Sequence, residues 1–126
     1  MQLLLDTHIL LWVMSNDKRL SKDVAKMILD SHNRVIVSSV SFWEISIKKV
    51  LGKISISLTD LKKSVEECQF ELLPFTAEHC IALSELPLLH RDPFDRMLVA
   101  QSKLEPATLV TSDSALSGYG EFVLLV

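Results

Sequence analysis

The sequence lacks the cysteine patterns and long apolar runs that would indicate a zinc-binding, secreted or membrane protein. Its two cysteines, Cys68 and Cys80, form no CxxC pair and have no histidine spacing suited to zinc. Both fall in segments with a helical pattern, where we expect them to be buried as small hydrophobic residues. The longest uninterrupted apolar stretch, residues 9–14, is too short to span a bilayer. The first apolar run meets Asp6 too early for a secretory signal, so we expect a reduced cytoplasmic location and no membrane.

The chain also lacks a surplus of positive charge. Its 13 basic residues face 16 acidic ones, for a formal net charge of −3. This argues against a protein that binds nucleic acid through bulk positive charge, although a local basic rim around an acidic site stays compatible. No repeat, low-complexity segment or Pro/Gly-rich linker interrupts the sequence. With 126 residues, of which 48% are hydrophobic, the chain is predicted to form one domain over residues 1–126.

What the sequence does contain is an alternation of apolar strands and helical patterns. We expect strands at 2–5, 34–39, 70–73, 107–112 and 122–126. We expect helices at 7–14, 21–32, 39–53, 58–69, 76–86 and 92–104. Nearly all-apolar strands that alternate with helices indicate a parallel sheet covered on both faces, so the predicted class is α/β.

Local signals indicate how several helices begin and end. Ser21 and Thr59 are candidate N-caps, because their hydroxyls can accept from the first free backbone N–H groups. In the helix predicted at 39–53, Gly52 can close the last turn. One face of that helix is apolar, as in an amphipathic helix, and consists of Val40, Trp43, Ile47, Val50 and Leu51.

Carboxylates follow the predicted strands at one edge of the sheet, where open parallel sheets form their sites. Asp6 comes directly after the first strand, and Asp113 directly after the strand at 107–112. Glu44 lies in the first turn of the helix after the second strand, and Asp95 in the first turn of the helix at 92–104. We therefore expect these four acids to converge.

Each acid also has a structural interpretation. Asp6 and Asp113 could cap the turns that follow them. Glu44 could form a capping box with Ser41, or pair with Lys48 one turn on. Asp92 is a good N-cap ahead of Pro93, and Asp95 suits the positive end of the helix dipole.

Taken together, the acids favour chemistry over capping. Several like charges in one pocket are mutually unfavourable unless a cation binds. An all-oxygen set of ligands favours a hard ion, Mg²⁺ or Mn²⁺, and such an ion suits hydrolysis of a phosphodiester. An aspartyl-phosphate enzyme is disfavoured, because its second Asp, two residues after the first, is replaced here by His8.

Four segments together resemble the signature segments of the PIN-domain family, and most closely its VapC-type toxins of bacterial toxin–antitoxin pairs. In order, they are LLLDTHILLW, SSVSFWEISIKKVLGKI, HRDPFDRMLVAQ and LVTSDSAL. The resemblance runs nearly end to end. It implies a PIN-like three-layer sandwich with a central parallel sheet, and a metal-dependent endoribonuclease that uses Mg²⁺ or Mn²⁺. The catalytic and metal-binding residues that it implies are Asp6, Glu44, Asp95 and Asp113.

Supporting roles follow from the same resemblance. Asp92 is then the helix cap and adds to the acidic field, while Thr7 and Ser39 are candidate polar supports beside Asp6. Basic residues near the acids could steer the RNA backbone, with Arg96 the closest to the site in sequence. The full basic set is Lys48, Lys49, Lys53, Arg91 and Arg96.

The resemblance also implies partners: an RNA substrate, a second copy in a homodimer and a cognate VapB-like antitoxin. A mean hydropathy of +0.30 is high for a small monomer and agrees with surface buried in interfaces. Trp12 and the apolar stretch 9–14 could line an antitoxin groove or pack in the core. The alternatives to a ribonuclease are a deoxyribonuclease on the same acids and a PIN-fold module that binds RNA or protein with little catalysis. The second is disfavoured because all four acids are present.

Overall fold

The computed structural model describes all 126 residues, and its centre is one sheet of five parallel strands. The strands are β1 (Gln2–Leu5), β2 (Arg34–Ser38), β3 (Glu71–Leu73), β4 (Thr108–Thr111) and β5 (Val123–Leu125). Their order is β3-β2-β1-β4-β5, and every neighbouring pair is parallel. The order reverses between β1 and β4, so the chain leaves these two adjacent strands in opposite directions. A crevice at such a switch point is where open α/β sheets bind their ligands.

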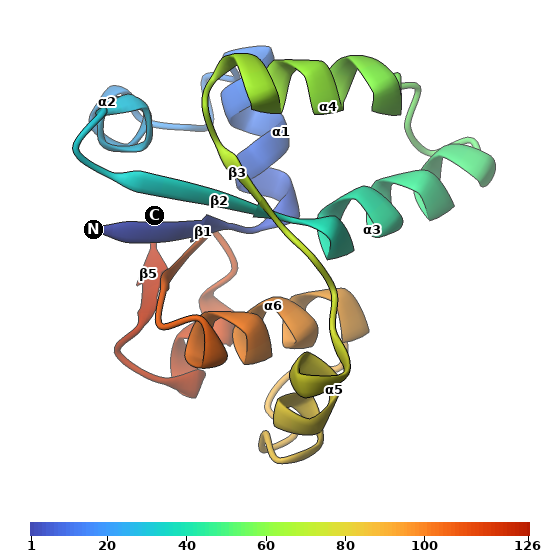
Figure 1. Cartoon of the computed structure of the whole chain (residues 1–126), viewed down its shortest axis with the longest axis vertical. Helices are drawn as coiled ribbons and strands as arrows, with labels where there is room; N and C mark the ends of the chain where they lie inside the picture. Colours follow the sequence, from blue (N-terminus) through green and yellow to red (C-terminus); the bar gives the residue numbers. More distant parts are fainter.

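Helices cover both faces of the sheet and confirm the α/β class with three layers. They are α1 (Thr7–Ser15), α2 (Lys22–Leu29), α3 (Ser39–Val50), α4 (Leu58–Glu67), α5 (Ala77–Ser84) and α6 (Pro93–Leu104), with a 3₁₀ helix η1 (Ser114–Tyr119). In Figure 1, α1, α2 and α4 lie on one side of the sheet and α5 and α6 on the other, while α3 leaves from the end of β2. None of these helices combines the length and the apolar character needed to cross a membrane.

Alternating side chains of the strands supply two separate cores. On β1, Leu3 and Leu5 pack with residues of α1, α2 and α4, whereas Leu4 points to the other face and packs with α6. The period of two along a strand places neighbouring residues on opposite faces. A strand buried on both faces must therefore be apolar throughout, as the sequence of β1 is.

All the predicted strands and helices are present, most of them with shorter ends. The helix expected at 21–32 stops at Leu29, and the one expected at 39–53 stops at Val50. Ser21 caps α2 as predicted, by accepting from the Val24 N–H at 3.2 Å. Gly52 follows α3 with a φ of +74°, in the left-handed region that favours glycine. The Thr59 cap was wrong, because α4 begins earlier and Ser57 accepts from the Asp60 N–H at 3.2 Å.

The apolar face expected for α3 does not face a core. Val40 is buried, but Trp43, Ile47, Val50 and Leu51 are exposed, and Val50 keeps 87% of its surface. The side of α3 that is buried instead carries Val40, Ser41, Glu44 and Ile45. The helix thus turns Ser41 and Glu44 inward together with Val40 and Ile45, and its apolar stripe is left outside.

The burial predicted for the two cysteines was also wrong. Cys68 is the C-terminal cap of α4, where the helix runs out into solvent. Cys80 lies on the outer side of α5, because its neighbour His79 occupies the buried side. Both thiols are exposed and unpaired.

A buried polar chain fixes α5 and α6 against the end of β2. Ser38 Oγ donates to Gln101 Oε1 at 2.6 Å, and Gln101 Nε2 lies 3.2 Å from His79 Nδ1. His79 Nε2 in turn lies 2.8 Å from a carboxylate oxygen of Glu105. Ser38 is also the N-cap of α3, through the Val40 N–H at 3.0 Å. These buried hydrogen bonds set the positions of α3 and α6, the two helices that carry Glu44 and Asp95.

Candidate metal centre

Asp6 stands at the end of β1, at the centre of the sheet edge, and is held on both carboxylate oxygens. Oδ1 accepts from the Ile9 N–H at 2.8 Å, so Asp6 caps α1. Oδ2 accepts from the Thr111 hydroxyl at 2.5 Å. Only 3% of the residue is exposed, and this burial raises its pKa, while the bonds from Thr111 and Ile9 act in the opposite direction.

Glu44 reaches the same edge from α3. The capping box predicted with Ser41 is absent, because Ser38 caps the helix and Glu44 lies deeper in it. The predicted pair with Lys48 is present, with Lys48 Nζ 2.7 Å from Glu44 Oε2. The other oxygen, Oε1, is buried and has no hydrogen-bond partner. A buried carboxylate oxygen without a partner is costly, so this atom is suited to a ligand.

Asp92 and Asp95 lie at the beginning of α6 and have different surroundings. Asp92 Oδ1 accepts from the N–H groups of Phe94 at 2.8 Å and Asp95 at 3.0 Å, which confirms Asp92 as the N-cap. The Asp95 carboxylate makes no such bond, and burial raises its pKa to about 7. The negative charges of Asp92, Asp6 and Glu44 add to this increase.

Asp113 follows β4 and begins η1. Its Oδ1 accepts from the Ala115 N–H at 3.0 Å, and its Oδ2 lies 2.9 Å from Nε2 of His90. The bond to His90 lowers the pKa of Asp113. The side chain is 41% exposed, so Asp113 forms the open side of the site.

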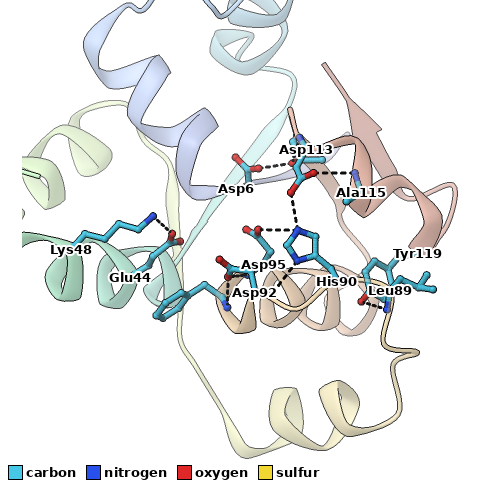
Figure 2. Close-up of polar contacts among 12 residues, drawn as sticks. Asp6, Glu44, Lys48, Leu89, His90, Asp92, Asp95, Asp113, Ala115 and Tyr119 are labelled. Atoms are coloured by element: carbon cyan, nitrogen blue, oxygen red, sulfur yellow. Dashed lines mark hydrogen bonds and ion pairs between the residues drawn. The ribbon is translucent and has the colours of Figure 1, made fainter. Parts of the chain in front are cut away.

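The four predicted acids are therefore brought to one edge of the sheet. In Figure 2 the carboxylates of Asp6, Asp95 and Asp113 point into a common space between the end of β1 and the beginning of α6, with Glu44 beside it on α3. Their negative fields overlap, since Asp6 and Glu44 both raise the pKa of Asp95. One oxygen each of Asp95 and Asp113 and a ring nitrogen of His90 lie within 4.8 Å of one another.

The supporting residues expected from the sequence are placed differently. Thr7 donates to Ser41 Oγ at 2.9 Å and makes no hydrogen bond to Asp6. Ser39 is exposed, so the serine beside Thr7 is Ser41. Arg96 donates from Nη2 to the Leu86 carbonyl at 3.2 Å and forms no ion pair with the acids. Of the predicted basic residues, Lys48 alone contacts an acid of the site, while Lys49, Lys53 and Arg91 are exposed.

The family of the chain follows from its match to a known protein-family model. The family model of the PIN domain matches residues 3–121 of the chain. The chain belongs to the PIN-domain family. PIN domains are generally nucleases that use divalent metals, which agrees with a site built from carboxylates. No curated protein sequence matches the chain.

Solved structures share the whole fold of this PIN domain. VapBC2 from Rickettsia felis, bound to a DNA fragment from its promoter, has a TM-score of 0.71 at 18% identity, over 100% of this chain and 98% of that one. FitAcB from Neisseria gonorrhoeae has a TM-score of 0.67 at 16% identity, over 98% and 96%. VapBC-1 from nontypeable Haemophilus influenzae has a TM-score of 0.60 at 18% identity, over 90% and 87%. At these identities the similarity establishes the fold.

The residues of this PIN domain fit a divalent ion of the hard class. The donors are carboxylate oxygens, the kind of ligand that Mg²⁺ and Mn²⁺ prefer. Glu44 Oε1 is buried without a partner, and the pKa of Asp95 is raised to about 7 by burial and, to a smaller extent, by the negative charges of nearby carboxylates. A bound cation would relieve both conditions.

Two residues of the PIN domain site were missed from the sequence. Thr111 bonds Asp6 and accepts from the Asp113 N–H at 3.0 Å, and His90 contacts Asp113. The signal for Thr111 was its place two residues before Asp113, which puts both side chains on one side of the strand end. His90 gave no local signal, because its partner Asp113 is 23 residues away.

Proposed function

We propose that this chain is a metal-dependent endoribonuclease and the toxin of a VapBC-like toxin–antitoxin pair. The observation that carries the proposal is the group of four carboxylates at the switch point of the sheet, one with a buried oxygen that has no protein partner. Four caps at four helix ends would not need an unpaired buried oxygen. A cation site explains it.

Asp6, Glu44, Asp95 and Asp113 would hold Mg²⁺ or Mn²⁺. When bound, such an ion lowers the pKa of a water molecule and neutralises charge on a phosphodiester. Asp6 is held in place for this role by Thr111 and by the Ile9 N–H, so its carboxylate needs little reorganisation. Lys48 fixes one oxygen of Glu44 and leaves the other available.

The side chain of Asp95 controls the proton balance of the proposed site. Its pKa of about 7 means that a proton occupies the carboxyl over most of the acidic range. That proton and an ion compete for the same oxygens, so ion binding should weaken as the pH falls below neutrality. RNA cleavage with Mg²⁺ or Mn²⁺ should likewise decrease as the pH falls below neutrality.

RNA is the proposed substrate, on the basis of the family resemblance and the surroundings of the site. Lys49 and Lys53 lie on or just after α3, and Arg91 immediately precedes the Asp92 cap, all exposed. In the sequence, the two lysines follow Glu44 and Arg91 precedes Asp92. These cations could bind phosphates on either side of the cleaved bond. The net negative charge of the protein then limits binding to this neighbourhood.

Two protein partners belong to the proposal. The similar structures are toxin–antitoxin complexes, which supports a VapB-like antitoxin as the partner of this chain. The apolar residues exposed on α3 support a homodimer, because large apolar side chains gathered on one face favour association.

The direct test is digestion of RNA by the purified protein with Mg²⁺ or Mn²⁺ present. Cleavage should stop with EDTA, return with excess ion and be absent in Asp6→Asn. Asp60→Asn, an exposed acid in the first turn of α4, is a matched control and should keep full activity. Cleavage that survives both EDTA and Asp6→Asn would rule out this site. A parallel digestion of single-stranded DNA distinguishes a ribonuclease from a deoxyribonuclease. Co-expression with any small protein encoded beside this one tests for the antitoxin.

A further inference from the structure

The ring of His90 is fixed by two hydrogen bonds on opposite sides. Nδ1 accepts from the backbone N–H of Asp92 at 3.0 Å, and Nε2 lies 2.9 Å from Asp113 Oδ2 (Figure 2). A backbone N–H can only donate, so Nδ1 must present its lone pair. In the neutral ring the hydrogen is then on Nε2, and His90 donates to Asp113.

This tautomer decides what His90 can do beside a metal ion. Its Nε2 faces Asp113 at 2.9 Å and Asp95 at 3.7 Å, so by position alone it could be a third ligand. A nitrogen that carries a hydrogen has no lone pair for a metal. Moving the hydrogen to Nδ1 would require breaking the bond from Asp92, whose side chain also caps α6. The local geometry therefore favours a hydrogen-bond donor over a ligand.

Asp113 is the acid that most needs such a donor. It is the most open of the four, and its only other side-chain bond is the one from the Ala115 N–H to Oδ1. With Oδ1 held by Ala115 and Oδ2 by His90, the plane of the carboxylate is set, and each oxygen keeps a further lone pair. Without His90 the side chain would be free to turn toward solvent.

We propose that His90 is a positioning residue of the metal centre, which orients Asp113 toward the ion through its Nε2–H and does not itself bind the ion. The inference rests on the metal site of the proposed function. It assigns a role to the first residue of the segment HRDPFD. The backbone of Asp92 fixes the ring, and the ring fixes the acid after β4.

Two substitutions test the two hydrogen bonds of the His90 ring separately. In His90→Gln the side-chain amide nitrogen can replace Nε2 as the donor to Asp113. In His90→Asn the shorter side chain can replace only Nδ1, so the bond from Asp92 is kept and the one to Asp113 is lost. His32→Asn is the control, since His32 is an exposed histidine that contacts only Asp30, beyond the end of α2.

The measurement is Mn²⁺ binding to the RNA-free protein, by calorimetry and by the electron paramagnetic resonance signal of free Mn²⁺. We expect His90→Asn to weaken Mn²⁺ binding about 10-fold, the lower end of the effect of losing a partner of a metal ligand. His90→Gln should lie closer to the unmodified protein, and His32→Asn should equal it. Electron spin echo spectra of Mn²⁺ bound to the unmodified protein should contain no nitrogen coupling from a directly bound histidine.

Each contrary result has a distinct meaning. A coupling from directly bound nitrogen that disappears in His90→Asn would make His90 a ligand and overturn the proposal. Equal Mn²⁺ affinity in His90→Asn and the unmodified protein would overturn it as well. If the unmodified protein binds no Mn²⁺, the metal site of the proposed function fails, and this inference fails with it. The spin echo spectrum of the unmodified protein needs no variant, and the absence of a nitrogen coupling there excludes His90 as a ligand even if His90→Asn does not fold, which circular dichroism would reveal.

Discussion

The Thr111 hydroxyl donates a 2.5 Å hydrogen bond to Oδ2 of Asp6, across 105 residues of sequence. The bond joins the ends of β4 and β1, the two strands between which the sheet order reverses. It is buried and acts on an acid whose pKa is already raised by burial. The same hydroxyl accepts from the Asp113 N–H, so Thr111 connects two of the four acids.

Thr111→Val should therefore lower both stability and ion affinity. Valine has the same shape but leaves a buried oxygen of Asp6 without its donor, at a cost of about 1–3 kcal/mol in the free energy of unfolding. The pKa of Asp6 should rise further, which weakens its hold on a cation. Urea unfolding and Mn²⁺ calorimetry measure the two effects. Thr111→Ser keeps the hydroxyl and should behave much more like the unmodified protein, so equal losses in both variants would contradict this role.

The pKa of Asp95 predicts how the metal-free protein responds to pH. In the unfolded chain this carboxyl loses its proton near 3.8, and in the folded protein near 7. Between these values the folded state holds a proton that the unfolded state has lost. The free energy contributed by Asp95 is therefore fully present below about pH 4 and is lost as the pH rises through 7.

Thermal unfolding in EDTA at about pH 5 and about pH 8 tests this prediction. Asp95→Asn should reduce the fall in melting temperature between the two values, because asparagine carries no charge at either. The groups that face Asp95 are Asp92, Asp6, Glu44 and His90, all unchanged in this variant. Added Mn²⁺ should restore stability at the higher pH by binding only the folded state. A pH dependence identical in both proteins would show that Asp95 is not the group responsible.

Asp92 and Asp95 should differ in what their substitution affects. Asp92→Ala removes the cap that accepts from two N–H groups of α6, so we expect a loss of about 1 kcal/mol in stability with most of the activity kept. Asp95→Asn removes a carboxylate that repels its neighbours, so it should abolish RNA cleavage while leaving the metal-free fold at least as stable. Chemical denaturation and RNA digestion on the same preparations separate the two. Loss of cleavage in a normally folded Asp92→Ala protein would reverse the assignment.

The apolar residues exposed on α3 predict self-association. Val50 is 87% exposed, Leu51 at the C-cap is 62% exposed, and Trp43, earlier on α3, is 52% exposed. Val50→Lys should shift the protein toward monomer in sedimentation experiments, because a charge is costly to bury in an apolar interface. Leu29→Lys, at a 60% exposed leucine that ends α2, is the control and should not change the distribution. An unmodified protein that stays monomeric at high concentration would contradict the homodimer.

The sequence by itself determined the features that depend on near neighbours. The all-apolar strands and the helical periods between them predicted the parallel α/β sheet, because strands buried on both faces cannot be polar. The same sheet rule placed Asp6 and Asp113 at one edge from the sequence alone. The Asp92–Pro93 pair identified the cap of α6, since capping acts over three residues.

Only the tertiary structure decided which way each helix faces and which distant groups meet. The apolar stripe of α3 was visible in the sequence, but its outward direction is set by the packing of Val40 and Ile45 against the rest of the protein, which the helical period alone does not specify. Ser41, and not Ser39, lies buried beside Thr7, because each residue along a helix turns the side-chain direction by about 100° and Ser41 falls on the buried side of α3. Thr111 and His90 acquire their roles from acids 105 and 23 residues away. Such contacts exist only once the sheet has formed, because they join segments that nothing in the local sequence connects.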